Sequence, residues 1–185
     1  MRSIKDIFLS YAEIVDGRHV NGTDKCTNHD YSAAYESLLP NRKNVKMVME
    51  VGVADGSCLL AWREVFPNAT IVGMDIHHSD KAHGDRIEFH LGDQRSLEDC
   101  RRAAAGRQFD LIVEDATHNV TDNLVTLIYL WPFVKPGGLY VIEEFGNVGA
   151  LRENVSALWT NVEIVDTDGP FGGVEPLVVF LKSSR

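Results

Sequence analysis

The sequence predicts an α/β fold in which a mainly parallel sheet is covered by helices on both faces. Two observations support this prediction. From Val45 onward, short apolar runs of strand length alternate with segments of helical spacing, and strands joined through helices pair in parallel by right-handed crossovers. The last two predicted strands are instead joined by a loop without a helix, which indicates an antiparallel hairpin at one edge.

The strands are predicted from apolar runs that are bounded by turn residues. The first run, Val45–Val53, is almost continuously apolar, as expected for a strand buried on both faces. Further runs of strand length are Thr70–Ile76, Ile87–Leu91, Phe109–Val113, Leu139–Ile142, Val162–Val165 and Leu177–Leu181. Together they predict a Rossmann-like, doubly wound, mainly parallel sheet of seven strands with a C-terminal antiparallel β-hairpin.

Helical spacing of apolar residues fills the intervals between these strands. It predicts helices at Ser57–Phe66, Ser96–Ala105, Asn123–Phe133 and near Leu151–Leu158. The turn Lys135-Pro136-Gly137-Gly138 is expected to end the third of them. The first forty or so residues are expected to be helix and loop. Their amphipathic stretch, Ile4–Val15, packs either on its own sheet or against a second subunit, which leaves a homo-oligomer open.

Composition excludes several classes of protein. The chain has 185 residues, which is enough for one domain with a sizeable core. Its formal net charge of −9 argues against a nucleic-acid-binding surface, because such a surface needs clustered Lys and Arg. No apolar run reaches the roughly 20 residues of a membrane span. The cysteines, Cys26, Cys58 and Cys100, form no CxxC pair, so a cytoplasmic location is expected.

A glycine-containing loop follows the first predicted strand. Residues 50–56 read Glu-Val-Gly-Val-Ala-Asp-Gly, of the form ExGxxxG, and glycines at this point let the backbone approach a ligand. The GxGxxG of dinucleotide enzymes is absent, and the acids Glu50 and Asp55 disfavour a diphosphate. The loop therefore suits a cofactor that carries a cationic amino group and a sulfonium.

Polar residues also end the second and third predicted strands. Asp75 is positioned to accept both hydroxyls of a ribose, and Asp93 and Gln94 are positioned to meet an adenine edge. Each of them alone would be interpreted as a turn residue or a helix cap. Their common register with the glycine loop favours a nucleotide-type site.

Acids follow the fourth and fifth predicted strands, in Glu114-Asp115-Ala116-Thr117-His118 and in Glu143-Glu144. Neighbouring parallel strands end at one edge of a sheet, so these acids are expected to converge. Carboxylates in one cleft repel one another unless they share a cation or a proton, and oxygen ligands favour Mg²⁺. His118 is a candidate general base, because imidazole titrates near neutrality. Taken singly, each acid is more simply a helix cap or half of a surface ion pair.

On these motifs the sequence resembles the class I S-adenosylmethionine-dependent methyltransferases over roughly residues 45–181. More narrowly, it resembles the metal-dependent macrolide-sugar O-methyltransferases of the mycinamicin type and their cephalosporin-hydroxylase-like relatives. The narrower resemblance rests on Asp115 with His118, on Glu143-Glu144, and on an upstream stretch made of Gly22-Thr23-Asp24-Lys25, His29, Tyr31 and Tyr35. Ala116 and Glu144 depart from the family pattern, which has glycine and aspartate there.

The resemblance implies a role for each of these residues. Glu50, Gly52, Asp75, Asp93 and Gln94 would contact S-adenosyl-L-methionine. Asp115, Glu143 and Glu144 would bind Mg²⁺, and His118, with Asp115 beside it, would be the catalytic base. Asp24, Lys25, His29 and Tyr31 would lie on the acceptor side as a lid, or would form a solvated loop.

The function expected from this resemblance is methyl transfer to a hydroxyl of a small-molecule acceptor, such as a sugar or another natural product. Residues 1–44 are expected to form an N-terminal helical and loop segment, as an acceptor lid or a dimer contact, and residues 45–185 the methyltransferase domain. Neither nucleic acid nor membrane is expected as a partner. The alternatives are a non-catalytic S-adenosylmethionine-binding or scaffold protein and, less favoured, a nicotinamide-dependent reductase.

Overall fold

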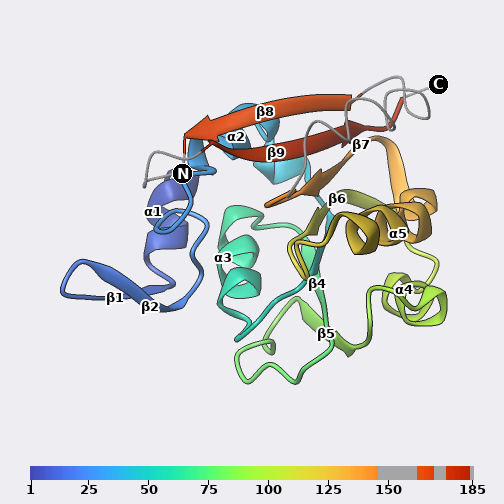
Figure 1. Ribbon diagram of the computed structural model, residues 1–185, viewed down its shortest axis with the longest axis horizontal. Coiled ribbons are helices and arrows are strands. Elements are labelled where there is room, and N and C mark those ends of the chain that lie inside the picture. Colours follow the sequence, from blue (N-terminus) through green and yellow to red (C-terminus); the bar gives the residue numbers. More distant parts are fainter. Residues whose placement is uncertain (146–161, 169–173, 184–185) are drawn as a thin grey trace.

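The main sheet has the predicted Rossmann-like architecture. The structure, a computed structural model, describes residues 1–145, 162–168 and 174–183. Within these residues the sheet has seven strands in the order β5-β4-β3-β6-β7-β9-β8 (Figure 1). Strands β3 to β7 pair in parallel, whereas β9 pairs antiparallel with both β7 and β8. The mainly parallel sheet and its closing hairpin are therefore confirmed.

The strands lie close to the predicted apolar runs. Their bounds are β3 (Met47–Val51), β4 (Thr70–Asp75), β5 (Ile87–Leu91), β6 (Phe109–Glu114), β7 (Val134–Ile142), β8 (Val162–Asp168) and β9 (Val174–Leu181). The prediction was wrong at the start of β7, because the Lys135-Pro136-Gly137-Gly138 segment lies inside this strand. A register shift opposite Phe109 and Leu111 accommodates the segment. Such irregularities are where strands tolerate proline and glycine.

The helices between the strands are α3 (Ser57–Val65), α4 (Leu97–Ala104) and α5 (Val120–Leu130), followed by the 3₁₀ helix η2 (Trp131–Phe133). Helix α5 begins earlier than predicted because the Asn119 side chain accepts hydrogen bonds from the backbone N–H groups of Thr121 and Asp122. The predicted helix near Leu151–Leu158 lies outside the described residues. No helix of the described part is long and apolar enough to cross a bilayer.

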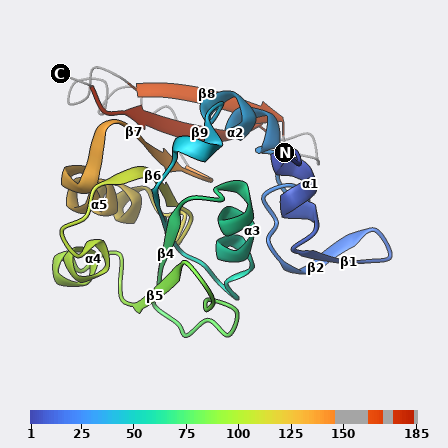
Figure 2. The ribbon, with the colours of Figure 1, turned by 180° about the vertical axis from the view of Figure 1, so that it is seen from behind.

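The helices cover both faces of the sheet, as a doubly wound fold requires. Helix α3 lies on one face together with the N-terminal helices, and α4 and α5 lie on the other (Figures 1 and 2). Trp62 of α3 is fully buried, with its ring 4.7 Å from Phe8, 5.1 Å from Tyr35 and 5.6 Å from Phe66. It is therefore a packing residue, as an aromatic side chain in a helix usually is.

The N-terminal segment contains a β-hairpin that the sequence interpretation missed. The order is α1 (Ile4–Leu9), β1 (Ala12–Val15), β2 (Arg18–Gly22), α2 (Ser32–Leu38) and η1 (Arg42–Asn44). The expectation of helix and loop was therefore wrong for β1 and β2. The reason is the two-residue turn Asp16-Gly17, whose φ angles of 52° and 75° are both positive. Asp-Gly with two positive φ values is the type I′ turn that joins hairpin strands.

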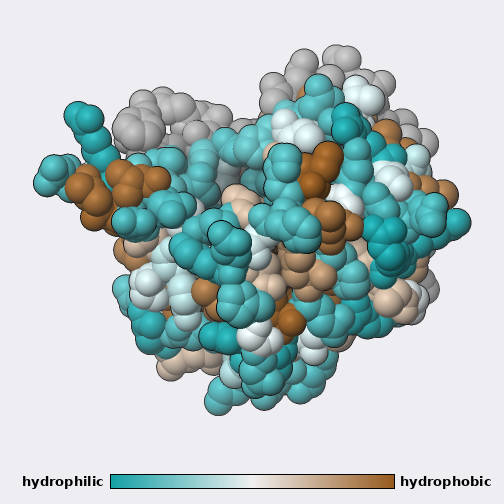
Figure 3. All heavy atoms as spheres, turned by 90° about the horizontal axis from the view of Figure 1, so that it is seen from below, coloured by the Kyte–Doolittle hydropathy of each residue, from teal (hydrophilic) through white to brown (hydrophobic). Residues whose placement is uncertain are grey.

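The amphipathic stretch divides accordingly into a buried and an exposed part. Ile4, Ile7 and Phe8 of α1 are buried in the core beside α3, so the helix packs on its own chain. The hairpin projects from the body, and apolar side chains gather on it (Figure 3). Among these, Ile14 and Val20 are 48% and 55% exposed.

Candidate active site

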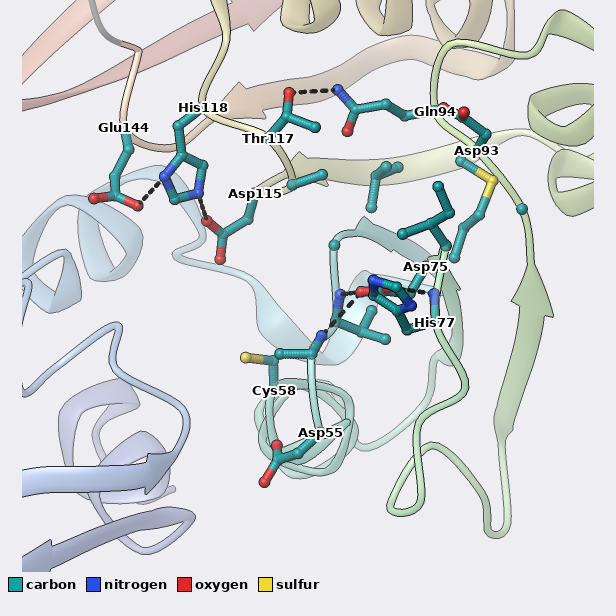
Figure 4. A pocket seen from close by; sticks show the side chains of 18 of the residues that line it. Asp55, Cys58, Asp75, His77, Asp93, Gln94, Asp115, Thr117, His118 and Glu144 are labelled. Atoms are coloured by element: carbon teal, nitrogen blue, oxygen red, sulfur yellow. Dashed lines mark hydrogen bonds and ion pairs between the residues drawn. The ribbon is translucent and has the colours of Figure 1, made fainter.

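A cavity of about 680 Å³ opens at the C-terminal ends of β3, β4 and β6. Its volume lies within the range of roughly 300–1,000 Å³ usual for small-molecule sites. The predicted site residues that line it are Asp24, Gly52, Asp75, Asp93, Gln94, Asp115, His118 and Glu144, and Figure 4 shows most of them around it. Glu50 and Glu143 are buried with Lys25 and do not line the cavity.

Gly52 allows two loops to lie in contact. Its φ is +83°, and a Cβ built on it would lie 2.2 Å from the backbone oxygen of Asp115. On the other side, the Gly52 N–H donates to the Met74 carbonyl at 2.8 Å. Glycine is thus required because the loop after β3 is pressed against the loop after β6. This brings the glycine loop next to Asp115.

Asp75, at the end of β4, holds the glycine loop in place. Its Oδ2 accepts from the backbone N–H groups of Val53 at 2.9 Å and Ala54 at 3.1 Å. Its Oδ1 accepts from His77 N at 2.8 Å. A carboxylate offers about four acceptor sites. Acceptor capacity therefore remains on Asp75 for a ligand hydroxyl.

Asp93 and Gln94 lie on the far side of the cavity, after β5. Hydrogen bonds from Arg95 lower the pKa of Asp93, with Arg95 Nη2 2.8 Å from Oδ2. Gln94 is 5% exposed, and its Nε2 donates to Thr117 Oγ1 at 3.2 Å. Its Oε1 is buried and has no hydrogen-bond partner among the described residues. A buried oxygen without a donor, on the lining of a cavity, is suited to a ligand N–H group.

Asp115, His118 and Glu144 form a connected row on the side of the cavity opposite Asp93 and Gln94, at the upper left of Figure 4. His118 Nε2 lies 3.3 Å from Asp115 Oδ1, and His118 Nδ1 lies 2.7 Å from Glu144 Oε2. One ligand atom from each residue can be chosen so that all three lie within 4.8 Å of one another. These residues can therefore hold one cation.

The backbone at two members of this row is unusual. His118 has φ 54° and Glu144 has φ 52°, so both adopt the left-handed conformation. For a non-glycine residue this costs on the order of 1–3 kcal/mol and is found preferentially at functional sites. In this conformation the side chains of His118 and Glu144 meet at the cavity, at a conformational cost in both loops.

His118 is an imidazolium in this arrangement, with both ring nitrogens protonated at neutral pH. Its hydrogen bonds to Asp115 and Glu144 raise the pKa of the imidazole to about 10. Both ring nitrogens then face carboxylate oxygens as donors. The ring can accept a proton only when one of these carboxylates is neutralised or drawn away.

Lys25 lies under the row, in the interior. Its side chain is 1% exposed, and its Nζ lies 3.0 Å from Glu50 Oε1, 2.6 Å from Asp115 Oδ2 and 2.5 Å from Glu143 Oε2. Burial alone would lower the pKa of Lys25, but these three carboxylates outweigh it and raise the pKa well above its ordinary value. Burial raises the pKa of Glu50 to about 7, against the opposing effect of Lys25. Tyr35 donates a hydrogen bond to the second oxygen of Glu143.

His29, from the predicted lid segment, connects the row to Asp24. His29 Nε2 lies 3.5 Å from Asp24 Oδ2 and 3.6 Å from Glu144 Oε1. Tyr31 is 1% exposed and stacks on His29 with a ring separation of 5.3 Å. Asp24 lies at the cavity wall, whereas Lys25 and Tyr31 are buried. The acceptor or lid role stays a prediction for Asp24, Lys25, His29 and Tyr31.

Glu114, at the end of β6, is not the helix cap that the simpler interpretation suggested, because Asn119 caps α5. Its side chain is fully buried, and both carboxyl oxygens lack hydrogen-bond partners among the described residues. Burial, with Asp115 beside it, raises the pKa of Glu114 to about 8. At neutral pH this carboxyl is therefore largely protonated.

The sequence interpretation missed several residues of the site. Arg95, His77 and Thr117 line the cavity and were assigned no role. Each stands within two residues of a predicted site residue, which is the only local signal for them. No local pattern predicts that Lys25 is buried against acids, because Asp115 and Glu143 are 90 and 118 positions away.

The fold and the cavity together define a class of protein. A parallel Rossmann-like sheet with a closing hairpin, and a site at its C-terminal edge, is the fold of the class I S-adenosylmethionine-dependent methyltransferases. Comparison with solved structures agrees with this. The MycE methyltransferase from the mycinamycin biosynthetic pathway, solved in complex with Mg and SAH, superposes over 100% of this chain and 56% of its own at a TM-score of 0.78 and 22% identity.

Sequence comparison identifies the relatives within that class. The chain is 31% identical over 133 residues to 8-demethyl-8-alpha-L-rhamnosyl tetracenomycin-C 2'-O-methyltransferase of Streptomyces olivaceus, covering 67% of this chain and 35% of that protein. It is 34% identical over 127 residues to mycinamicin VI 2''-O-methyltransferase of Micromonospora griseorubida, covering 63% and 31%.

The chain is therefore related to the macrolide and sugar O-methyltransferases, as the sequence resemblance indicated. It spans about a third of the length of the curated relatives that it matches. No protein-family model matches the chain.

Proposed function

We propose that this chain is the catalytic part of an S-adenosylmethionine-dependent O-methyltransferase that methylates a hydroxyl of a small-molecule acceptor, such as a sugar on a natural product. The observation that carries the proposal is one cavity with two halves. Asp75 and the unpartnered Oε1 of Gln94 lie in one half, and Asp115, His118 and Glu144 lie in the other. The names of the curated relatives support the same chemistry.

The cofactor half suits a nucleoside with a cationic tail. Asp75 would accept the ribose hydroxyls, and Gln94 Oε1 would accept from the adenine amino group. Asp93 would lie at the adenine side together with Arg95. Gly52 keeps the glycine loop against Asp115, so the methionine end of the cofactor would lie beside the second half. Glu50 acts indirectly, because it is buried behind that loop with Lys25.

The second half suits a hard divalent cation. Asp115 and Glu144 offer carboxylate oxygens to the cavity, and oxygen ligands are those that Mg²⁺ prefers. Glu143, predicted as a third ligand, is held by Lys25 and Tyr35 and would have to leave at least one of them. When bound, the cation would supply a positive charge that lowers the pKa of the acceptor hydroxyl.

His118 would then act as the base. With Asp115 and Glu144 directed to a cation, the hydrogen bonds that raise the pKa of the imidazole are weakened, and the ring can give up its proton. His118 lies between the two carboxylates, and in this proposal it would face an acceptor oxygen aligned with the methyl donor. Asp115 would keep the ring oriented.

The N-terminal segment would form the acceptor side. Gly22 and Asp24 line the cavity, and His29 reaches both Asp24 and Glu144. In this proposal residues 1–44 supply one wall of the acceptor site to the methyltransferase domain of residues 45–185. The free, buried cysteines support the proposed cytoplasmic location.

Ligand titration tests the cofactor assignment. Isothermal titration of the chain with S-adenosylhomocysteine is expected to show binding of one ligand per chain, whereas NAD is expected to show none. Asp75→Asn should weaken binding, and Asp80→Asn, at an exposed position in the loop after β4, should not. Binding of NAD in preference to S-adenosylhomocysteine would refute the proposal.

Turnover tests the cation and the base. With a sugar-hydroxyl acceptor panel and labelled cofactor, methyl transfer is expected to stop in excess chelator and to return with Mg²⁺. His118→Ala is expected to lose transfer while it retains cofactor binding, and exposed His83→Ala serves as the control. Full transfer by a metal-free protein would remove the cation from the proposal. Full transfer by His118→Ala would remove the base.

A further inference from the structure

Lys25 joins three strand ends through one ammonium group. It lies between β2 and α2, far in sequence from its partners. Its Nζ is nevertheless within 3.0 Å of three carboxylate oxygens, one from a residue near the C-terminal end of β3, one from the residue after β6 and one from the residue after β7. These carboxylates belong to Glu50, Asp115 and Glu143. The side chain is 1% exposed, so no bulk water competes for these contacts.

Asp115 is shared between this buried cluster and the cavity. Its Oδ2 contacts Lys25 at 2.6 Å, and its Oδ1 faces His118 at 3.3 Å. The two oxygens of Glu143 are both engaged inward, one by Lys25 and one by Tyr35. A cation in the cavity would therefore draw on a carboxylate that an ammonium already holds.

The charges set the direction of the effect. Two cations that share one carboxylate repel each other, and the repulsion is strong where water is excluded. In addition, every oxygen that Lys25 holds must be released or shared before a divalent ion can use it. Removing the ammonium leaves three buried carboxyl groups without a counter-charge, and a divalent ion can then supply the positive charge that Lys25 supplied.

We propose that Lys25 is a positioning residue that competes with a divalent cation for Asp115 and Glu143. It thereby weakens cation binding at the cavity while it holds the three strand ends together when no cation is bound. The inference rests on the cation site of the proposed function.

Mn²⁺ titration of the whole chain, followed by the electron paramagnetic resonance signal of the free ion, measures the competition. Lys25→Met is expected to bind Mn²⁺ roughly tenfold or more tightly than wild type, because the competing charge is gone. Lys25→Gln, which keeps hydrogen-bond donors and loses only the charge, is expected to do the same. Lys5→Met removes an exposed lysine that pairs with Asp30 at 2.9 Å, and it should leave the affinity unchanged.

Thermal unfolding gives a second readout. Without a cation, Lys25→Met is expected to melt below wild type, and Mn²⁺ should raise its melting temperature more than that of wild type. A Lys25 variant with unchanged or weaker Mn²⁺ binding overturns the inference. If Lys25→Met is unfolded without a cation, refolding in Mn²⁺ decides the matter. Recovery of native circular dichroism supports the competition, and failure to fold in saturating Mn²⁺ overturns it.

The failure of this inference is distinguishable from the failure of the proposed function. Wild type that binds no Mn²⁺ while Lys25→Met binds it supports the competition and removes the cation from the native reaction. Wild type that binds Mn²⁺ as tightly as both Lys25 variants leaves the proposed function intact and overturns the role of Lys25.

Discussion

Replacing Glu114 by glutamine should make the protein more stable than wild type at alkaline pH. Glu114 is fully buried, neither of its oxygens has a hydrogen-bond partner among the described residues, and burial raises its pKa to about 8. A raised carboxyl pKa means that the folded state prefers the protonated form. The stability that this gives is fully present below the unfolded pKa near 4.5 and is lost as the pH rises to about 8.

The size of the effect follows from the shift. From 4.5 to about 8 is about 3.5 pKa units, which at roughly 1.36 kcal/mol per unit is on the order of 5 kcal/mol as an upper bound. Glutamine keeps the shape and cannot ionise. The free energy of unfolding of Glu114→Gln, relative to wild type, should therefore increase steadily between these two pH values and then level off.

Urea denaturation at a series of pH values from 4 to 9, followed by circular dichroism, measures this difference. Every other titrating group is common to both proteins, so the difference isolates position 114. Glu98→Gln, at an exposed position of α4, is the matched control and should show no such rise. A difference for Glu114→Gln that does not change with pH would show that the buried carboxyl does not titrate as argued.

Three further substitutions test other parts of the structure. Gly52→Ala should lower the melting temperature and abolish S-adenosylhomocysteine binding, because its Cβ would meet the Asp115 backbone at 2.2 Å. Gly17→Ala is the control: its φ is also positive, but nothing lies within 4 Å of the added Cβ, so it should lower the free energy of unfolding by only about 1–2 kcal/mol. Asp75→Asn should weaken S-adenosylhomocysteine binding roughly tenfold to hundredfold by calorimetry, as loss of hydrogen bonds to a charged group does. Trp62→Ala should lower the free energy of unfolding by about 3–5 kcal/mol in denaturant, because its ring is fully buried among three aromatic rings. An unchanged melting temperature for Gly52→Ala, an unchanged affinity for Asp75→Asn or an unchanged denaturation midpoint for Trp62→Ala would contradict the respective expectation.

The parallel strands could be predicted because each is a short apolar run whose burial does not depend on distant detail. Three residues of β3 are at most 1% exposed: Val48, Met49 and Val51. The almost continuously apolar run from Val45 indicated this burial directly. The N-terminal hairpin was missed because its strands are short and mostly exposed, so they show no apolar alternation. The Asp16-Gly17 dipeptide was the available signal.

The candidate site could be predicted only as far as strand ends fix positions. Asp75, Asp93 and Asp115 reach the cavity because parallel strands bring their C-terminal residues to one edge. The division of the acids into a cavity group and a buried group could not be foreseen. It depends on Lys25, whose side chain enters the interior from a separate segment of the chain. Pairing over such separations is set by tertiary packing.

The central place of β3 has a consequence for how the site comes to exist. β3 lies between β4 and β6, and β6 is added only after β4, β5 and α4 along the chain. Until β6 pairs, one edge of a strand that is buried on both faces in the folded chain stays open, and open edges of this kind favour association between chains. A shortened chain that keeps the glycine loop but stops before Phe109 would lack Asp115 and expose that edge. Folding of the second half therefore completes the cavity, and it is also expected to protect the first half from association between chains.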